Sequence, residues 1–161
     1  MKPKIAIIGI GYIGLPLALS LGKYYDTIAY DINAKLITRL KNKIDINNEV
    51  STLDFKKSKK ISFTNLISDI ENCNYYILTV PTPVDKKNNP DLKILLNVIN
   101  NIAKYIKKND TVILESTIYP GATDEVVIPL LEKISKLKLN NDFYVCYSPE
   151  RANPGDKSHK I

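Results

Sequence analysis

Short runs of apolar residues alternate along this chain with segments whose apolar residues recur every three or four positions. Each run is too short for a helix and is bounded by polar or turn-forming residues, which is typical of a strand buried on both faces. The runs predict six β-strands, the third being the weakest, at residues 4–8, 27–30, 60–63, 75–80, 111–114 and 143–146.

The segments between the runs predict helices. The longest apolar stripe repeats over residues 92–106, with Asp91 as the expected N-cap. Three further helices are expected at residues 13–21, 36–40 and 123–136, and the last should kink or restart at Pro129. The segment 42–60 is the least regular, and we expect a loop or a short helix there.

Strands that alternate with helices form a parallel sheet with helices on both faces. Because crossovers between parallel strands are right-handed, a doubly wound arrangement is the natural topology. We therefore expect an α/β, Rossmann-like fold whose sheet is doubly wound and mostly parallel. Residues 1–161 would form one domain, and we expect it to be a piece of a longer protein because the sequence stops directly after a motif.

Composition and charge exclude some classes of protein. The chain has 161 residues, of which 44% are apolar and 25% charged, so it suits one globular domain and not a disordered segment. The net charge is +6, but 21 of the 23 basic residues are lysines, scattered except for the run at 56–60. Since base and phosphate recognition favours arginine, we expect a solvated lysine-rich surface and no nucleic-acid partner.

The two cysteines, Cys73 and Cys146, stand far apart and match no metal or redox spacing. We expect each to be a small, buried, reduced thiol, as in a cytoplasmic protein, and we expect no metal site.

Residues 5–22 carry no charge and could be taken for an export signal or a short membrane span. Gly9, Gly11, Gly14 and Pro16 would break a uniform apolar helix near its middle. A strand, a glycine-rich turn and a helix account for the segment better, so we expect no membrane partner.

That turn has the spacing Gly9-x-Gly11-x-x-Gly14, between a predicted strand and a predicted helix. In this context the spacing predicts a dinucleotide site, with the pyrophosphate at the helix N-terminus. Asp31, which follows the second strand, stands where a carboxylate should bind the adenosine ribose and repel a 2′-phosphate, so NAD is favoured over NADP. The alternative is a glycine-rich turn beside a surface aspartate.

Two further motifs follow predicted strands, where ligands bind in open parallel sheets. Val80-Pro81-Thr82 makes a stiff loop with a hydroxyl available for a ribose or phosphate, or a loop that merely ends a strand. Ser116 and Thr117 bring two more hydroxyls to the same edge, unless they cap the next helix.

The last motif contains Glu150 beside Arg151, between prolines. The carboxylate could act as a general base or position a water, and the guanidinium could hold a phosphate or carboxylate. The alternative is a surface turn, and the nearby His159 is interpreted as incidental.

Taken in order, the four motifs resemble the N-terminal NAD-binding domain of the UDP-glucose/GDP-mannose dehydrogenase family. The branch that they resemble most is that of the UDP-N-acetylhexosamine (GalNAc or GlcNAc) 6-dehydrogenases of bacterial polysaccharide synthesis. Members oxidise the sugar C6 alcohol to a uronate in two NAD-dependent steps. The resemblance implies that NAD is bound by Gly9, Gly11, Tyr12, Ile13, Gly14, Asp31, Lys35, Val80, Pro81, Thr82, Ser116 and Thr117.

The resemblance further implies that Glu150 and Thr117 are catalytic, through the water that hydrolyses a thioester. Glu150, Arg151, Ala152 and Asn153 would contact the UDP-sugar substrate. Many relatives carry an arginine five residues after the acid of the second strand, whereas this chain has Leu36, with Lys35 beside it.

Family members also have a central helix with a catalytic lysine and a C-terminal domain with the nucleophilic cysteine. Neither Cys73 nor Cys146 lies in the corresponding motif. We therefore expect this chain alone to bind NAD weakly at best and not to turn over substrate, and the full-length protein to be a homodimer. The alternatives are a stand-alone NAD-sensing module and a different dehydrogenase that shares only the glycine-rich fingerprint.

Overall fold

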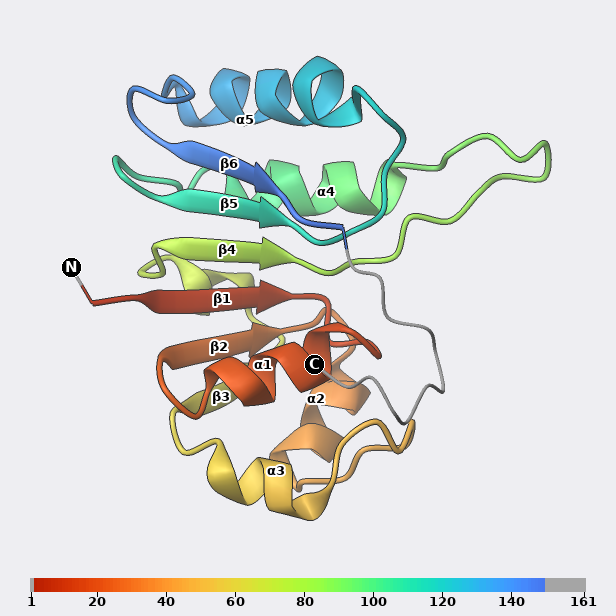
Figure 1. The fold of residues 1–161 in the computed structure, drawn as a ribbon, viewed down its shortest axis with the longest axis vertical. Helices are drawn as coiled ribbons and strands as arrows, with labels where there is room; N and C mark the ends of the chain where they lie inside the picture. Colours follow the sequence, from red (N-terminus) through yellow and green to blue (C-terminus); the bar gives the residue numbers. More distant parts are fainter. Residues whose placement is uncertain (1, 150–161) are drawn as a thin grey trace.

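The computed structural model describes residues 2–149 as six strands, five α-helices and two short helical turns around one sheet (Figure 1). The strands are β1 (Lys4–Ile8), β2 (Asp26–Tyr30), β3 (Ile61–Thr64), β4 (Tyr75–Leu78), β5 (Thr111–Leu114) and β6 (Tyr144–Tyr147). The helical elements are α1 (Gly14–Leu21), α2 (Ala34–Lys41), α3 (Thr52–Lys57), the 3₁₀ turn η1 (Ile67–Ile70), α4 (Lys93–Ile102), the π-helical turn η2 (Thr123–Val127) and α5 (Ile128–Ser135).

All six strands are parallel and lie in the order β3-β2-β1-β4-β5-β6. The chain winds outward from β1 in one direction and then from β4 in the other, so the doubly wound, Rossmann-like sheet is confirmed. Two apolar cores cover its two faces. Helices α1, α2 and α3 pack on one face over the β1–β3 half, and α4 and α5 pack on the other over the β4–β6 half, as Figure 1 shows.

The predicted strands agree with the structure except at their ends. Strand β4 ends at Leu78, two residues early, because the chain turns into a loop with Pro81, which has no N–H to give to the sheet. Strand β6 begins at Tyr144 because the Phe143 carbonyl instead accepts a hydrogen bond from the Asn140 N–H at 2.8 Å.

The helices differ from the prediction at two points. Helix α4 ends at Ile102, although Ile106 is still buried, because the apolar stripe marks burial and continues into a turn. Leu92, and not Asp91, is its N-cap residue, while the Asp91 carboxylate accepts from the Lys93 N–H at 3.0 Å.

The other helical predictions are confirmed. The restart expected near Pro129 is the junction between η2 and α5. The short helix expected within 42–60 is α3, which Ser51 and Asp54 begin with a reciprocal capping box.

Candidate functional site

The loops that follow β1, β4 and β5 meet at the carboxyl ends of the strands, where the order of the sheet reverses between β1 and β4. In an open parallel sheet this reversal opens a crevice in which ligands bind. The predicted motifs at 9–14, 80–82 and 115–117 all lie in these loops.

Two glycines of the first motif are required by close packing. Gly9 has a left-handed φ of 97°, and a Cβ placed on it would lie 2.9 Å from Val80 Cγ1. A Cβ on Gly14 would lie 1.9 Å from the Gly9 carbonyl oxygen and 2.7 Å from Thr79 Oγ1. No other residue type fits at either position without moving the backbone.

Gly11 is different because nothing in the described chain lies within 4 Å of a Cβ built there. The space above its backbone is therefore open. No side chain of residues 2–149 caps the N-terminus of α1, so the positive end of the helix dipole faces this space. The arrangement suits a phosphate group that approaches the backbone closely.

Asp31 holds the glycine-rich turn from the end of β2. Its Oδ2 accepts from the Ile10 N–H at 2.9 Å, and its Oδ1 accepts from the Asn33 N–H at 2.8 Å. Each carboxylate oxygen can accept a second hydrogen bond, so the oriented group can still bind hydroxyls of a ligand. Lys35 is exposed in the first turn of α2, where its N–H donates to Asn33 Oδ1 at 3.1 Å.

A cavity of about 300 Å³ separates the glycine-rich turn from the loops after β4 and β5. Seven residues predicted to bind NAD line it, namely Tyr12, Ile13, Val80, Pro81, Thr82, Ser116 and Thr117. Thr79, Pro83 and Glu115 line it as well. The structure thus brings together residues more than a hundred positions apart in the sequence.

Two of the cavity hydroxyls bind the main chain. The buried Ser116 hydroxyl donates to the Val80 carbonyl at 2.7 Å, and the Thr82 hydroxyl donates to the Thr117 carbonyl. These bonds fasten the loop after β4 to the loop after β5. The sequence offered both hydroxyls to a ligand, and their contacts in the structure are with the protein backbone.

Thr79 is a residue of the site that the sequence alone did not indicate. Its hydroxyl donates to the Gly9 carbonyl at 2.6 Å, which joins the end of β4 to the glycine-rich turn. The available signal was its position as the first polar residue after a buried strand that pairs with β1. Glu115, another residue that lines the cavity, lies at the corresponding point after β5.

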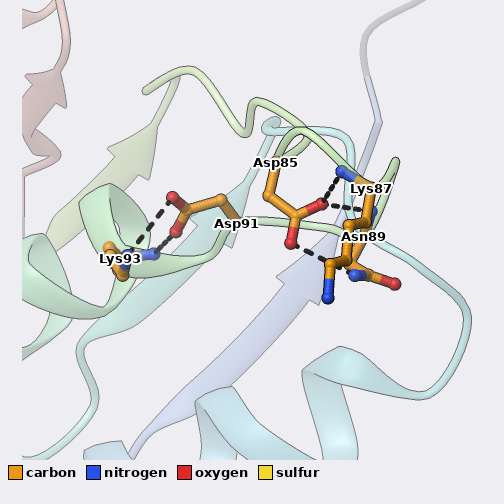
Figure 2. Close-up of polar contacts among 5 residues, drawn as sticks. All are labelled: Asp85, Lys87, Asn89, Asp91 and Lys93. Carbon is orange, nitrogen blue, oxygen red and sulfur yellow. Dashed lines mark hydrogen bonds and ion pairs between the residues drawn. The ribbon is translucent and has the colours of Figure 1, made fainter.

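The loop between β4 and α4 projects beyond the carboxyl ends of the strands (Figure 1) and is braced internally. Figure 2 shows the Asp85 carboxylate accepting from the Lys87 and Asn89 N–H groups at 2.7 and 2.9 Å and from Asn89 Nδ2 at 3.1 Å. Hydrogen bonds from Asn89, and then from Lys87, lower the pKa of Asp85. The Asp91 N–H closes the base of the loop on the Pro83 carbonyl at 2.8 Å.

The two cysteines differ from each other. Cys73 is buried as expected, and burial raises the pKa of its thiol to about 11. The expectation that Cys146 is buried was wrong: Cys146 is exposed, and it lies on β6, the strand at the edge of the sheet. The part of the chain that the structure describes has no cluster of three His, Cys, Asp or Glu residues suited to a metal ion.

Glu150, Arg151, Ala152 and Asn153, predicted to bind substrate, lie outside the described residues, as does His159. Within residues 2–149 no helix is both long enough and apolar enough to cross a membrane.

Known proteins resemble this chain over nearly its whole length. The model of the UDP-glucose/GDP-mannose dehydrogenase family, NAD binding domain, matches residues 3–161. UDP-N-acetyl-D-glucosamine 6-dehydrogenase from Pseudomonas aeruginosa is 48% identical over 158 residues, which cover 98% of this chain and 37% of that relative.

Two solved structures have the same fold over nearly the whole chain. UDP-D-ManNAc dehydrogenase from Pyrococcus horikoshii matches with a TM-score of 0.83 and 34% identity over 94% of this chain and 37% of its own. A ternary complex of GDP-mannose dehydrogenase from Pseudomonas aeruginosa matches with a TM-score of 0.85 and 26% identity over 94% and 37%. This chain thus spans 37% of the length of these relatives. The expected family and cofactor are confirmed: the chain belongs to the UDP-glucose/GDP-mannose dehydrogenase family, of which it carries the NAD-binding domain.

Proposed function

We propose that NAD lies across the crevice between β1 and β4, with its pyrophosphate over Gly11 at the N-terminus of α1. The observation that carries this proposal is the contrast among the three glycines. Gly9 and Gly14 have no room for a Cβ because protein atoms fill it, whereas the space at Gly11 is open. A pyrophosphate would occupy that space, where the positive end of the α1 dipole favours its negative charge.

Asp31 would bind the adenosine ribose. Its carboxylate is oriented by the Ile10 and Asn33 N–H groups and retains acceptor capacity for two ribose hydroxyls. A 2′-phosphate at the same place would face a fixed negative charge, so the site should select NAD over NADP. Lys35, in the following helix, would be a cation available to the adenosine phosphate, because Leu36 stands where many relatives carry an arginine.

The nicotinamide half would lie in the cavity between the loops. Tyr12, Ile13, Val80 and Pro81 supply an apolar lining for a planar ring, and Thr117 presents an exposed side chain at its rim. Thr82 and Ser116 would shape this half by fixing the loops.

For the whole protein we propose an NAD-dependent 6-dehydrogenase that converts the C6 alcohol of a UDP-N-acetylhexosamine, or another UDP-hexose, to the uronate. The similarity to UDP-N-acetyl-D-glucosamine 6-dehydrogenase supports this substrate class. NAD⁺ accepts the hydride when bound. Glu150 and Thr117 would hold the hydrolytic water, and Arg151, Ala152 and Asn153 would contact the nucleotide sugar. We further propose that it works as a homodimer in the cytoplasm.

Isothermal titration with NAD⁺ and NADP⁺ tests the cofactor site. The chain should bind NAD⁺ and prefer it to NADP⁺, and Asp31→Ala should weaken NAD⁺ by about tenfold or more through the loss of charge-assisted hydrogen bonds. Asp26→Ala is the matched control, because Asp26 is an exposed aspartate at the opposite end of the same strand. If Asp31→Ala and Asp26→Ala lowered the affinity for NAD⁺ equally, the assignment of Asp31 to the ribose would be contradicted.

Formation of NADH by the whole protein with UDP-GlcNAc, UDP-GalNAc or UDP-glucose tests the reaction. We expect the unaltered protein to produce the uronate. The Glu150→Gln variant should bind NAD⁺ with the same affinity but produce no uronate. Tight NAD⁺ binding without oxidation of any of the three sugars would instead favour an NAD-sensing module.

A further inference from the structure

We infer that Tyr147 is a positioning residue whose hydroxyl fixes the Thr117 peptide at the rim of the cofactor cavity. This inference rests on the proposed function, in which Thr117 faces the nicotinamide half of NAD. It adds a role for a residue of β6, a strand that does not itself line the cavity.

The Tyr147 hydroxyl binds both polar groups of one residue in the loop after β5. It accepts from the Ile118 N–H at 3.4 Å and donates to the Ile118 carbonyl at 3.2 Å. The ring is 43% exposed, so filling the core does not explain its presence. A phenol at this point instead links the end of β6 to the residue that follows Thr117.

Three side-chain hydroxyls from three different places hold the backbone around Thr117. Ser116 is fastened to the Val80 carbonyl, the Thr117 carbonyl accepts from Thr82, and Ile118 is held by Tyr147. Ser116 and Ile118 are both buried, whereas Thr117 between them is exposed. The backbone on both sides of Thr117 is thus held in place, and the Thr117 side chain lies at the cavity.

Such fixing matters because a group that binds or orients a ligand works best when its position is set before the ligand arrives. Without the Tyr147 hydroxyl, the peptide after Thr117 loses its tie to β6. The loop would then have to be ordered when NAD binds, and the affinity would fall by the cost of that ordering.

Tyr144 provides a matched control. It lies on the same strand and is exposed to almost the same extent, 44%. Within residues 2–149 no hydrogen bond of its hydroxyl is found. Tyr144→Phe and Tyr147→Phe thus remove the same atom from similar surroundings, and only the second change removes a contact to the loop.

The experiment compares the two variants with the unaltered protein by titration with NAD⁺ and by hydrogen exchange of the Ile118 amide. Tyr147→Phe should raise the Kd for NAD⁺ by ~3–10-fold, the loss of one or two neutral hydrogen bonds, and should speed exchange at Ile118. Tyr144→Phe should change neither quantity. Thr82→Val, which removes a second bond to the same peptide, should raise the Kd by a similar factor.

A Kd for Tyr147→Phe equal to that of the unaltered protein would overturn the inference and leave the proposed function standing. The inference would also be overturned if Tyr144→Phe raised the Kd for NAD⁺ by as much as Tyr147→Phe does. Failure of the whole protein to bind NAD⁺ would overturn both the inference and the proposed function. In the whole protein, the loss of affinity should raise the KM for NAD⁺ more than it lowers kcat, a split that a general loss of stability would not produce.

Discussion

The two halves of the cofactor site are held in shape by different means. Around β1 and α1, backbone meets backbone, and the glycines at positions 9 and 14 permit contacts that any side chain would prevent. Around the ends of β4, β5 and β6, the loops are held by the hydroxyls of Thr82, Ser116 and Tyr147, which bind backbone groups of neighbouring loops.

The difference concerns how each half can fail. A backbone contact is lost only when an added atom forces the chains apart, and the cost of that overlap is large. A hydroxyl bond is removed by taking away one atom, and its net worth is small. We call the part around β1 and α1 the glycine half and the part around the ends of β4, β5 and β6 the hydroxyl half. A single substitution should therefore cost much stability in the glycine half and only a little in the hydroxyl half.

Gly14→Ala should have the largest effect. Its Cβ would lie 1.9 Å from the Gly9 carbonyl oxygen, so α1 must move and the free energy of unfolding should fall by about 3 kcal/mol, with NAD⁺ binding lost. Gly11→Ala is the control. Its Cβ would enter open space, so this change should weaken the binding of NAD⁺ without lowering the stability of the protein. Thermal unfolding and calorimetry distinguish the two. A Gly14→Ala protein as stable as the original would refute the close-packing argument.

Alkaline pH should act on the core that packs against β4–β6, the strands whose loops the hydroxyls hold. The core beneath β4–β6 contains Cys73, whose pKa burial raises from 9.0 to about 11, and Tyr76, whose pKa burial also raises. Between these two values for Cys73 the unfolded chain has lost the thiol proton while the folded chain retains it. Stability is therefore complete below pH 9 and should fall by roughly 2–3 kcal/mol by pH 11.

Urea titrations across this pH range test the prediction, with Cys73→Ala as the variant that should flatten the curve. The buried core on the other face contains no cysteine, tyrosine or charged residue among its described members. Amide exchange should thus accelerate first around β4, and a uniform acceleration over both halves would contradict the distinction.

Ser116→Ala should have an intermediate effect. The hydroxyl is 5% exposed, and its loss leaves the Val80 carbonyl without this donor, so stability should fall by about 1–2 kcal/mol and the NAD⁺ Kd should rise several-fold. Ser62→Ala, on the exposed face of β3, is the control and should change neither. An unaltered Kd in Ser116→Ala would mean that the two loops hold their positions without this bond.

Thr79→Val should have the smallest effect, about 1 kcal/mol, but it tests whether the halves are independent. The Thr79 hydroxyl is a direct link between them, through the Gly9 carbonyl. If the halves are separate, the stability losses of Thr79→Val and Ser116→Ala should add to within about 0.5 kcal/mol in the double variant. A larger departure from additivity would show that the halves act as one unit.

The sequence predicted the glycine half far better than the hydroxyl half. The spacing of Gly9, Gly11 and Gly14 has a single physical reason in a strand–turn–helix context, and the apolar runs located all six strands. The sequence does not predict the partner of a hydroxyl at the end of a strand, because the hydroxyl of Ser116 or Thr82 can bind either a ligand or a backbone carbonyl. Their partners are 35 to 36 residues away, and only the fold brings them together.

Strand and helix ends escaped prediction for a related reason. Strand β4 ends at Leu78 because the loop that follows contains Pro81, which has no N–H for the sheet. The apolar stripe that predicted α4 continues to Ile106, beyond the end of the helix at Ile102. Exposure of Cys146 depends on which strand lies at the edge of the sheet, and hydrophobicity alone does not give strand order.

The unequal exposure of the two thiols has a practical consequence. A maleimide dye added at neutral pH should label Cys146 and leave the buried Cys73 intact, so the protein carries a single attachment point for a fluorophore without any substitution. That point is the immediate neighbour of Tyr147 on β6, next to the loop that meets the cofactor cavity. A dye there would turn the ordering of this loop into an optical signal.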